Sequence, residues 1–170
     1  MMGEARDVST LARHVVATLT ERGHSVAVAE SLTGGLVCAS LTDVPGASAC
    51  VRGGVVSYAV DVKVDVLGVD AEVLARVGAV DPAVAVAMAE GVRRLLGATY
   101  GVATTGAAGP DPAPGGSQTS DVPAGRGFVA VCGPGADAVQ GFAVEPDGRD
   151  VVRAAAVHAA LRLLAQELST

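Results

Sequence analysis

The chain has 170 residues, which is long enough for one domain with a sizeable core. Hydrophobic residues make up 50% of it, but with two Phe, two Tyr and no Trp the core must be packed mainly from Val, Ala and Leu. A formal net charge of -6 argues against nucleic-acid binding, because contacts to phosphates need a basic face.

The first half of the chain predicts alternating helices and strands. Ser9 or Thr10 can cap a helix whose apolar residues recur with helical spacing and which Gly23 ends. After it we expect a strand over 24–29, a helix from Thr33 to about Leu41, a buried strand over 53–59, a short helix that starts at Asp61, and another helix over 71–77. The helix that Asp61 caps should carry Lys63 in its first turn and turn Val66 and Leu67 inward.

The second half begins with a clear helix start, Asp81 as cap and Pro82 at the first helical position, and this helix ends at Gly97. We then expect a strand over 100–104, a long loop over 106–126, a hairpin with strands over 128–132 and 139–144, and a terminal helix over 150–168. Helices before the hairpin imply an α/β fold, a mixed sheet with helices on both faces. Because no repeat or linker interrupts the chain, we expect a single domain over 1–170.

The cysteines and the N-terminus bear on the cellular setting. Cys38, Cys50 and Cys132 are odd in number and widely spaced, which is typical of small buried side chains in a reducing compartment. The first residues are charged, unlike a signal peptide, and no apolar run could span a bilayer. We therefore expect a cytoplasmic protein with no membrane partner. The histidines have no ligand spacing with each other or with cysteine, so we assign no metal site.

Ser31 is the candidate nucleophile. It directly follows an apolar strand and precedes the turn Thr33-Gly34-Gly35, where free backbone N–H groups at a helix start could hold a developing negative charge. The two glycines would let a ligand approach the backbone closely. The alternative is that Ser31 and Thr33 are only helix caps and that the glycines merely make the turn.

Lys63 supplies the base that a serine nucleophile needs. It is the only lysine of the chain and has valine at positions 60, 62, 64 and 66, so burial could lower its pKa from about 10.4 toward neutrality. None of the histidines lies at the carboxyl end of an expected strand. We therefore predict that Ser31 and Lys63 work as nucleophile and base. The alternative is a solvated lysine on an amphipathic helix.

Further polar candidates lie at predicted strand ends and turns. Tyr58 ends the second strand and could relay a proton or orient the lysine, or it could simply pack at the rim of the core. Thr105 and Gly106 begin a loop of small residues at the end of the third strand, where α/β proteins gather ligands, although a flexible turn is the alternative. Ser48 follows Pro45-Gly46 and could line the same cleft or be an ordinary turn serine.

Together these segments resemble the CinA C-terminal domain family, whose active members are nicotinamide-mononucleotide amidohydrolases. The resemblance runs in order from about residue 8 to the end of the chain. It is carried by Ala29-Glu30-Ser31-Leu32-Thr33-Gly34-Gly35, Thr42-Asp43-Val44-Pro45-Gly46-Ala47-Ser48, Arg52-Gly53-Gly54-Val55-Val56-Ser57-Tyr58, Lys63 with Leu67-Gly68-Val69, Gly78-Ala79-Val80, Met88-Ala89-Glu90-Gly91 and Thr105-Gly106-Ala107-Ala108-Gly109-Pro110.

The resemblance implies a three-layer α/β/α fold and a reaction of pyridine nucleotide salvage. The carboxamide of nicotinamide mononucleotide would be hydrolysed to nicotinate mononucleotide and ammonia, without metal or cofactor. Ser31 matches the family nucleophile, Lys63 its base and Tyr58 a supporting residue of the catalytic group. The expected substrate-binding set is Thr33, Gly34, Gly35, Ser48, Thr105 and Gly106. The implied partner is a small-molecule nucleotide, and self-association into a homo-oligomer stays open.

The sequence departs from the family pattern in three places. Where the family usually reads Tyr-Ser-Asn-x-Ala-Lys, Ala59 and Val60 replace the polar pair. The family's stretch near Lys-Pro-Val-Gly-Thr is here Val122-Pro123-Ala124-Gly125-Arg126, without the lysine, and the loop over 111–121 differs in composition. The competing hypothesis is therefore a catalytically silent domain that keeps the pocket for a nucleotide or a protein partner. An assay of ammonia release discriminates the two.

Overall fold

The computed structural model describes residues 2–169, with side chains for 7–135 and 137–169. Within this range five strands form one sheet in the order β2-β1-β3-β4-β5. The strands are β1 (Val26–Glu30), β2 (Val51–Val56), β3 (Tyr100–Ala107), β4 (Arg126–Gly133) and β5 (Ala136–Ala143). β1 pairs in parallel with β2 and β3, whereas β3 with β4 and β4 with β5 are antiparallel. The predicted mixed sheet is therefore confirmed.

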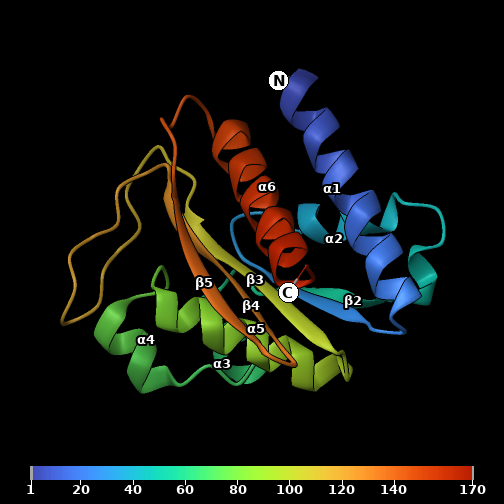
Figure 1. Cartoon of the computed structure of the whole chain (residues 1–170). Helices are drawn as coiled ribbons and strands as arrows, with labels where there is room; N and C mark the ends of the chain where they lie inside the picture. The colour runs from blue at the N-terminus through green and yellow to red at the C-terminus, as the bar shows by residue number, and fades with distance from the viewer. Residues whose placement is uncertain (1, 170) are drawn as a thin grey trace.

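Helices cover both faces of the sheet, and the three-layer α/β/α fold is confirmed. They are α1 (Met2–Glu21), α2 (Leu36–Thr42), α3 (Val60–Asp65), α4 (Ala71–Val77), α5 (Pro82–Leu96) and α6 (Arg149–Glu167), with a short 3-10 helix, η1 (Ala47–Ala49), before β2. Figure 1 shows α1, α2 and α6 on one side of the sheet and α3, α4 and α5 on the other. None of the described helices is long and apolar enough to cross a membrane.

Alternation along the strands divides the interior into two cores. On β1, Val26 and Val28 belong to the core under α1 and α6, whereas Ala27 and Ala29 belong to the core under α5. The side facing α5 is made of small residues, and a Cβ on Gly101 of β3 would come within 2.0 Å of a carbonyl oxygen of α5. The helix can therefore lie very close to the sheet without large aromatic side chains between them.

Some expected elements have the predicted bounds, and others do not. The helix over 71–77 is α4, and α5 begins at Pro82 behind its Asp81 cap and ends before Gly97, as predicted. α1, by contrast, begins at Met2, well before the expected caps at Ser9 or Thr10. α3 begins after Ala59 instead of at a cap by Asp61.

The expectation of a buried second strand is wrong. β2 is an edge strand that pairs only with β1, so its side chains alternate in exposure and Val56 is 50% exposed. Just after α3, which ends at Asp65, Leu67 is buried as predicted, but Val66 is exposed. The third strand, in contrast, is longer than expected. β3 continues to Ala107 because β4 pairs with it along its whole end.

The parallel strands bring the segments that hold the candidate site residues to the same end of the sheet. Glu30, the last residue of β1, lies between Val56 of β2 and Thr104 of β3 in the strand register. The residues that follow, Ser31 and Ser57, therefore lie together at the carboxyl edge of the parallel part of the sheet. This edge is where ligands bind in open α/β sheets.

Candidate active site

Ser31 stands directly after the central strand β1. Its backbone N–H donates to the carbonyl oxygen of Thr104 at 3.0 Å, which extends the pairing of β1 and β3 by one residue. Gly34 and Gly35 follow with φ values of 60° and 101°, in the left-handed region that favours glycine. These residues make a sharp turn, and α2 begins only at Leu36 instead of at Thr33. The serine is thus held at a fixed point between a buried strand and a glycine turn.

Lys63 reaches Ser31 from α3. The side chain of Lys63 is 1% exposed, and its Nζ lies 3.2 Å from the Oγ of Ser31. Nζ also lies 2.5 Å from the carbonyl oxygen of Ser57 and 3.4 Å from that of Tyr58. The predicted contact between the serine and the lysine is therefore present.

The two carbonyl contacts define what a neutral amine can do at this place. A carbonyl oxygen can only accept, so Ser57 and Tyr58 must each receive an N–H from Lys63. A neutral amine has two N–H groups and one lone pair. When both N–H groups point to carbonyls, the lone pair is left for the third neighbour, the hydroxyl of Ser31. The geometry thus favours transfer of the serine proton to the lysine.

Burial shifts the lysine toward its neutral form. Desolvation lowers the pKa of Lys63 from 10.5 to about 8, because a charged ammonium loses hydration in the protein interior. None of the described carboxylates forms an ion pair with this ammonium that would oppose the shift. A general base works best when its pKa is near the operating pH, and Lys63 meets this condition.

The backbone N–H groups at the start of α2 are bound by Glu30, a residue that the sequence reasoning missed. Its side chain is fully buried, and its carboxylate accepts from the backbone N–H groups of Gly35 and Val37, each at 3.0 Å, and of Cys38 at 2.8 Å. A carboxylate is stable there because the N-terminus of a helix carries free donors and a partial positive charge. The N–H groups of Gly35, Val37 and Cys38 are therefore taken by this carboxylate and are not free for a substrate.

Two amides of the turn remain available. Among the residues that the structure describes, the backbone N–H groups of Leu32 and Thr33 have no hydrogen-bond acceptor. They follow Ser31 directly. Donors of this kind beside a nucleophile can stabilise the oxyanion of an acyl-transfer reaction. The candidate oxyanion donors thus lie one turn earlier than the helix start.

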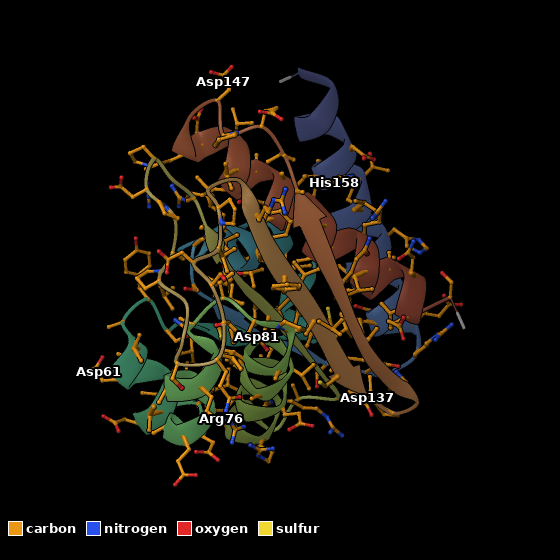
Figure 2. All side chains as sticks on the ribbon, turned by 90° about the vertical axis from the view of Figure 1, so that its left-hand side faces the viewer. Asp61, Arg76, Asp81, Asp137, Asp147 and His158 are labelled. Carbon is orange, nitrogen blue, oxygen red and sulfur yellow. The ribbon has the colours of Figure 1, made fainter. Side chains whose placement is uncertain are left out.

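A cavity of about 470 Å³ opens beside the pair, a volume typical of pockets for small ligands. It is lined by Ser31, Leu32, Tyr58, Lys63, Ala79, Val80, Thr105, Gly106, Ala107, Ala108, Gly109, Pro110, Asp111, Ala113, Pro114 and Arg149. Figure 2 looks at the side of the molecule with Asp61 on α3 and Asp147 before α6, and the loop between β3 and β4 runs between them. Another cavity, of about 500 Å³ beside β4 and β5, contains neither Ser31 nor Lys63.

Tyr58 and Arg149 meet across the cavity mouth. The ring of Tyr58 is 63% exposed, and its hydroxyl accepts from Nη2 of Arg149 at 3.3 Å. Nη1 of Arg149 donates to the carbonyl oxygen of Gly109 at 2.6 Å. The hydroxyl of Tyr58 therefore contacts Arg149 and not the amine of Lys63. It is the backbone carbonyl of Tyr58 that lies near this amine. This placement makes Tyr58 part of the cavity wall, and the expected proton relay through its hydroxyl stays a prediction.

Thr105 and Gly106 line the cavity, as expected from the sequence. The Oγ1 of Thr105 donates to the carbonyl oxygen of Ala79 at 2.6 Å, so this side chain ties the end of β3 to the segment between α4 and α5. A side chain on Gly106 would collide with the backbone of β4, because its Cβ would come within 2.9 Å of a carbonyl oxygen there. Both residues shape the pocket through backbone and packing.

The remaining predicted binding residues do not line the cavity. Thr33 is fully buried, and its Oγ1 lies 2.7 Å from the Oγ1 of Thr104. Gly34 and Gly35 serve the turn and α2. Ser48 lies in η1 before β2, at the opposite edge of the parallel strands from Ser31, because β2 runs from Val51 toward the site. None of these four residues is among those that line the cavity, and their expected contact with the substrate stays a prediction.

Two arginines of α6 complete the surroundings of the site and were also missed. Arg149 lines the cavity, and Arg153 donates to the carbonyl oxygens of Leu32 and Thr33. Their spacing of four places both on one face of the terminal helix. The sequence contains that signal, but nothing local indicates that this face meets a turn 120 residues earlier. Glu30 could have been found, because it directly precedes a glycine turn and a helix.

Comparisons with known proteins identify the family of the chain. The model of the CinA C-terminal domain family matches residues 8–168. A CinA-like protein of Anaeromyxobacter sp. (strain K) is 49% identical over 164 residues, and one of Frankia casuarinae is 48% identical over 155 residues. These alignments cover 96% and 91% of the chain but only 38% and 34% of the relatives, so the chain spans little more than a third of their length.

Solved structures give the same result over the whole fold. The competence/damage inducible protein CihA from Agrobacterium tumefaciens superposes with a TM-score of 0.87 at 36% identity, with 96% of each chain covered. A CinA superfamily protein from Escherichia coli superposes with a TM-score of 0.85 at 28% identity, with 94% of this chain and 89% of that chain covered. The chain belongs to the CinA C-terminal domain family.

Proposed function

We propose that this chain is a serine amidohydrolase that converts nicotinamide mononucleotide to nicotinate mononucleotide and ammonia. The observation that supports it most is the environment of Lys63. A buried amine has two backbone carbonyls for its hydrogens and the Ser31 hydroxyl 3.2 Å away. A lysine that only covered a helix surface would need none of these contacts.

The reaction follows from these positions in two halves. Neutral Lys63 takes the proton of Ser31 while Oγ attacks the carboxamide carbon, and the amides of Leu32 and Thr33 are available to the oxyanion. The lysine ammonium then gives its proton to the leaving nitrogen, so that ammonia departs and an ester to Ser31 remains. In the second half Lys63 takes a proton from water, hydroxide attacks the ester, and the carboxylate product leaves as Ser31 is reprotonated.

The cavity also offers groups for the rest of the substrate. Arg149 is a guanidinium whose recorded partners, among the described residues, are a carbonyl and the Tyr58 hydroxyl, so its charge is available to a phosphate. The exposed ring of Tyr58 offers an apolar face to a pyridine ring. With the carboxamide at Ser31, the phosphate would lie toward Arg149. This orientation would explain why the mononucleotide is the substrate.

The test is a direct assay of ammonia release from nicotinamide mononucleotide by the purified protein, with Ser31→Ala as the matched control. We expect turnover by the unchanged protein and none by the variant, with the nicotinate mononucleotide product identified by mass spectrometry. If no turnover occurs between pH 6 and 9 while calorimetry detects binding of the mononucleotide, the amidohydrolase proposal fails and the silent binding domain takes its place.

A further inference from the structure

Arg153 has an unusual set of partners for a half-buried arginine. Its Nε donates to the carbonyl oxygen of Leu32 at 3.0 Å, and its Nη2 donates to that of Thr33 at 2.9 Å. Among the described side chains no carboxylate forms an ion pair with it. The guanidinium of α6 is therefore directed to two consecutive peptide groups, and these directly follow the nucleophile Ser31.

These contacts determine where the amides of the turn point. In a planar trans peptide the C=O and the N–H point in opposite directions. Because Arg153 binds the carbonyl of Leu32, the N–H of Thr33, which belongs to the same peptide, points away from the arginine. The N–H of Leu32 shares its peptide with the carbonyl of Ser31, which accepts from the N–H of Gly34 at 3.1 Å. In each of the two peptides, the hydrogen bond that the carbonyl accepts therefore fixes the direction of the free N–H.

The site is shaped for an arginine. A Cβ on Gly34 would come within 3.3 Å of Nη2, so the glycine leaves space for the guanidinium against the turn. The planar fork presents Nε and Nη2 in fixed directions that match two neighbouring carbonyls. A lysine has a single flexible donor group and cannot hold both peptides in this way.

We infer that Arg153 is a positioning residue that, by binding the carbonyls of Leu32 and Thr33, holds the turn after Ser31 so that its free amides can receive the oxyanion. The inference rests on the proposed amidohydrolase function, because it assigns a role within that reaction. The hydrogen bonds of Arg153 go to Leu32 and Thr33 and those of Lys63 to other residues, so Arg153 should act on the stabilisation of the transition state and leave the base unchanged.

The kinetic test compares Arg153→Met and Arg153→Lys with Arg162→Met. Arg162 is an exposed arginine of the same helix, so its variant removes the same charge away from the turn. We expect kcat on nicotinamide mononucleotide to fall about 100-fold in Arg153→Met and roughly tenfold in Arg153→Lys, with KM nearly unchanged. The pH at which activity is half-maximal should stay the same in all variants. Equal kcat in Arg153→Met and Arg162→Met, or a shifted midpoint, would contradict the inference.

A second measurement separates this inference from the choice of substrate. A fluorophosphonate reacts with an activated serine when Oγ forms a bond to phosphorus, fluoride leaves and the base takes the serine proton. Its reaction with Ser31, followed by mass spectrometry with Ser31→Ala as blank, should be at least tenfold slower in Arg153→Met than in Arg162→Met. If the mononucleotide is not hydrolysed but this difference holds, the substrate is wrong and the positioning role stands. If Ser31 of the unchanged protein does not react, or reacts equally in both variants, the positioning role fails.

Folding is checked on the same samples. Circular dichroism and the thermal unfolding midpoint show whether Arg153→Met keeps the fold. If it does not, Arg153→Lys carries the test, because it retains the charge and the aliphatic stem. A folded Arg153→Lys variant with the kcat of the unchanged protein overturns the inference.

Discussion

The two walls of the cavity are built in different ways. The wall that holds Ser31 and Lys63 consists of strand ends and a buried turn, and the recorded hydrogen bonds fix the lysine nitrogen and the start of α2. The opposite wall consists of the β3–β4 loop, the exposed ring of Tyr58 and Arg149 at the start of α6. The first wall can hold reacting atoms precisely, and the second can adapt to a ligand. We therefore expect changes in the first wall to alter kcat and changes in the second to alter KM.

The largest effect should come from the reacting pair. Ser31→Ala and Lys63→Met should each lower kcat by roughly 10⁴-fold, and the double variant should be little worse than either single one, because the two residues act in one step. Steady-state kinetics with nicotinamide mononucleotide measures all three. Losses that add in free energy would show that the serine and the lysine do not share a step.

The pH dependence tests the same wall without changing its residues. Only neutral Lys63 can accept the serine proton, and its pKa is lowered to about 8. The ratio kcat/KM should therefore rise about tenfold per pH unit from pH 6 to near 8 and level off above it. A profile that is flat over this range would exclude the lysine as the base.

The same pKa has a consequence for stability with a defined sign. The folded protein holds the lysine proton less tightly than the unfolded chain does, so stability should rise with pH between about 8 and 10.5. The gain from this group is on the order of 3 kcal/mol. Denaturant unfolding of the unchanged protein and of Lys63→Met across this range isolates it. The difference in unfolding free energy between the two should change with pH, and a constant difference would show that Lys63 is not desolvated.

The second wall is tested through Arg149. Arg149→Met should raise KM for nicotinamide mononucleotide roughly tenfold or more and leave kcat almost unchanged, because a charged hydrogen bond to the phosphate is lost. Nicotinamide riboside lacks that phosphate, so its KM and kcat should be the same for the unchanged protein and for the variant. An equal rise in KM for both substrates would show that Arg149 supports the structure of the cavity entrance and does not bind the phosphate.

The smallest effect concerns the polar pair that this chain lacks. Ala59 is the residue before α3, its side chain makes no cap there, and Val60 is 52% exposed. Ala59→Ser with Val60→Asn adds a helix cap and a polar rim close to Tyr58. We expect KM to fall a few-fold, more than kcat rises, in steady-state kinetics. A larger change in kcat would mean that the pair acts on the Lys63 base.

The sequence predicted the parts of the site that depend on local order. Ser31 after a strand and Lys63 among valines could be recognised because strand ends, glycine turns and apolar neighbours are visible in a short window. The role of Glu30 was within reach for the same reason. Arg149 and Arg153 were not, because their partners are distant in the chain and meet them only through the packing of α6 on the sheet.

The same limit explains why Ser48 was grouped with the site. Ser48 follows a proline-glycine turn and Ser31 precedes a glycine turn, so each is a serine beside a turn when only the local sequence is considered. The direction of β2 decides that one lies at the amino end and the other at the carboxyl end of the sheet. The burial of Val56 was overestimated for a related reason, since a run of apolar residues does not reveal whether a strand has one neighbour or two.

The edge position of β2 also bears on how the proposed activity would be lost on warming. The carbonyls of Ser57 and Tyr58, which hold the lysine, follow a strand that is bonded on one side only, whereas Ser31 follows a strand bonded on both sides. Edge segments open more readily than central strands, with a lower free energy than global unfolding. Fraying of β2 would carry α3 away and separate base from nucleophile while the rest of the sheet stays folded. Inactivation by heat would then begin below the melting temperature of the protein and reverse on cooling.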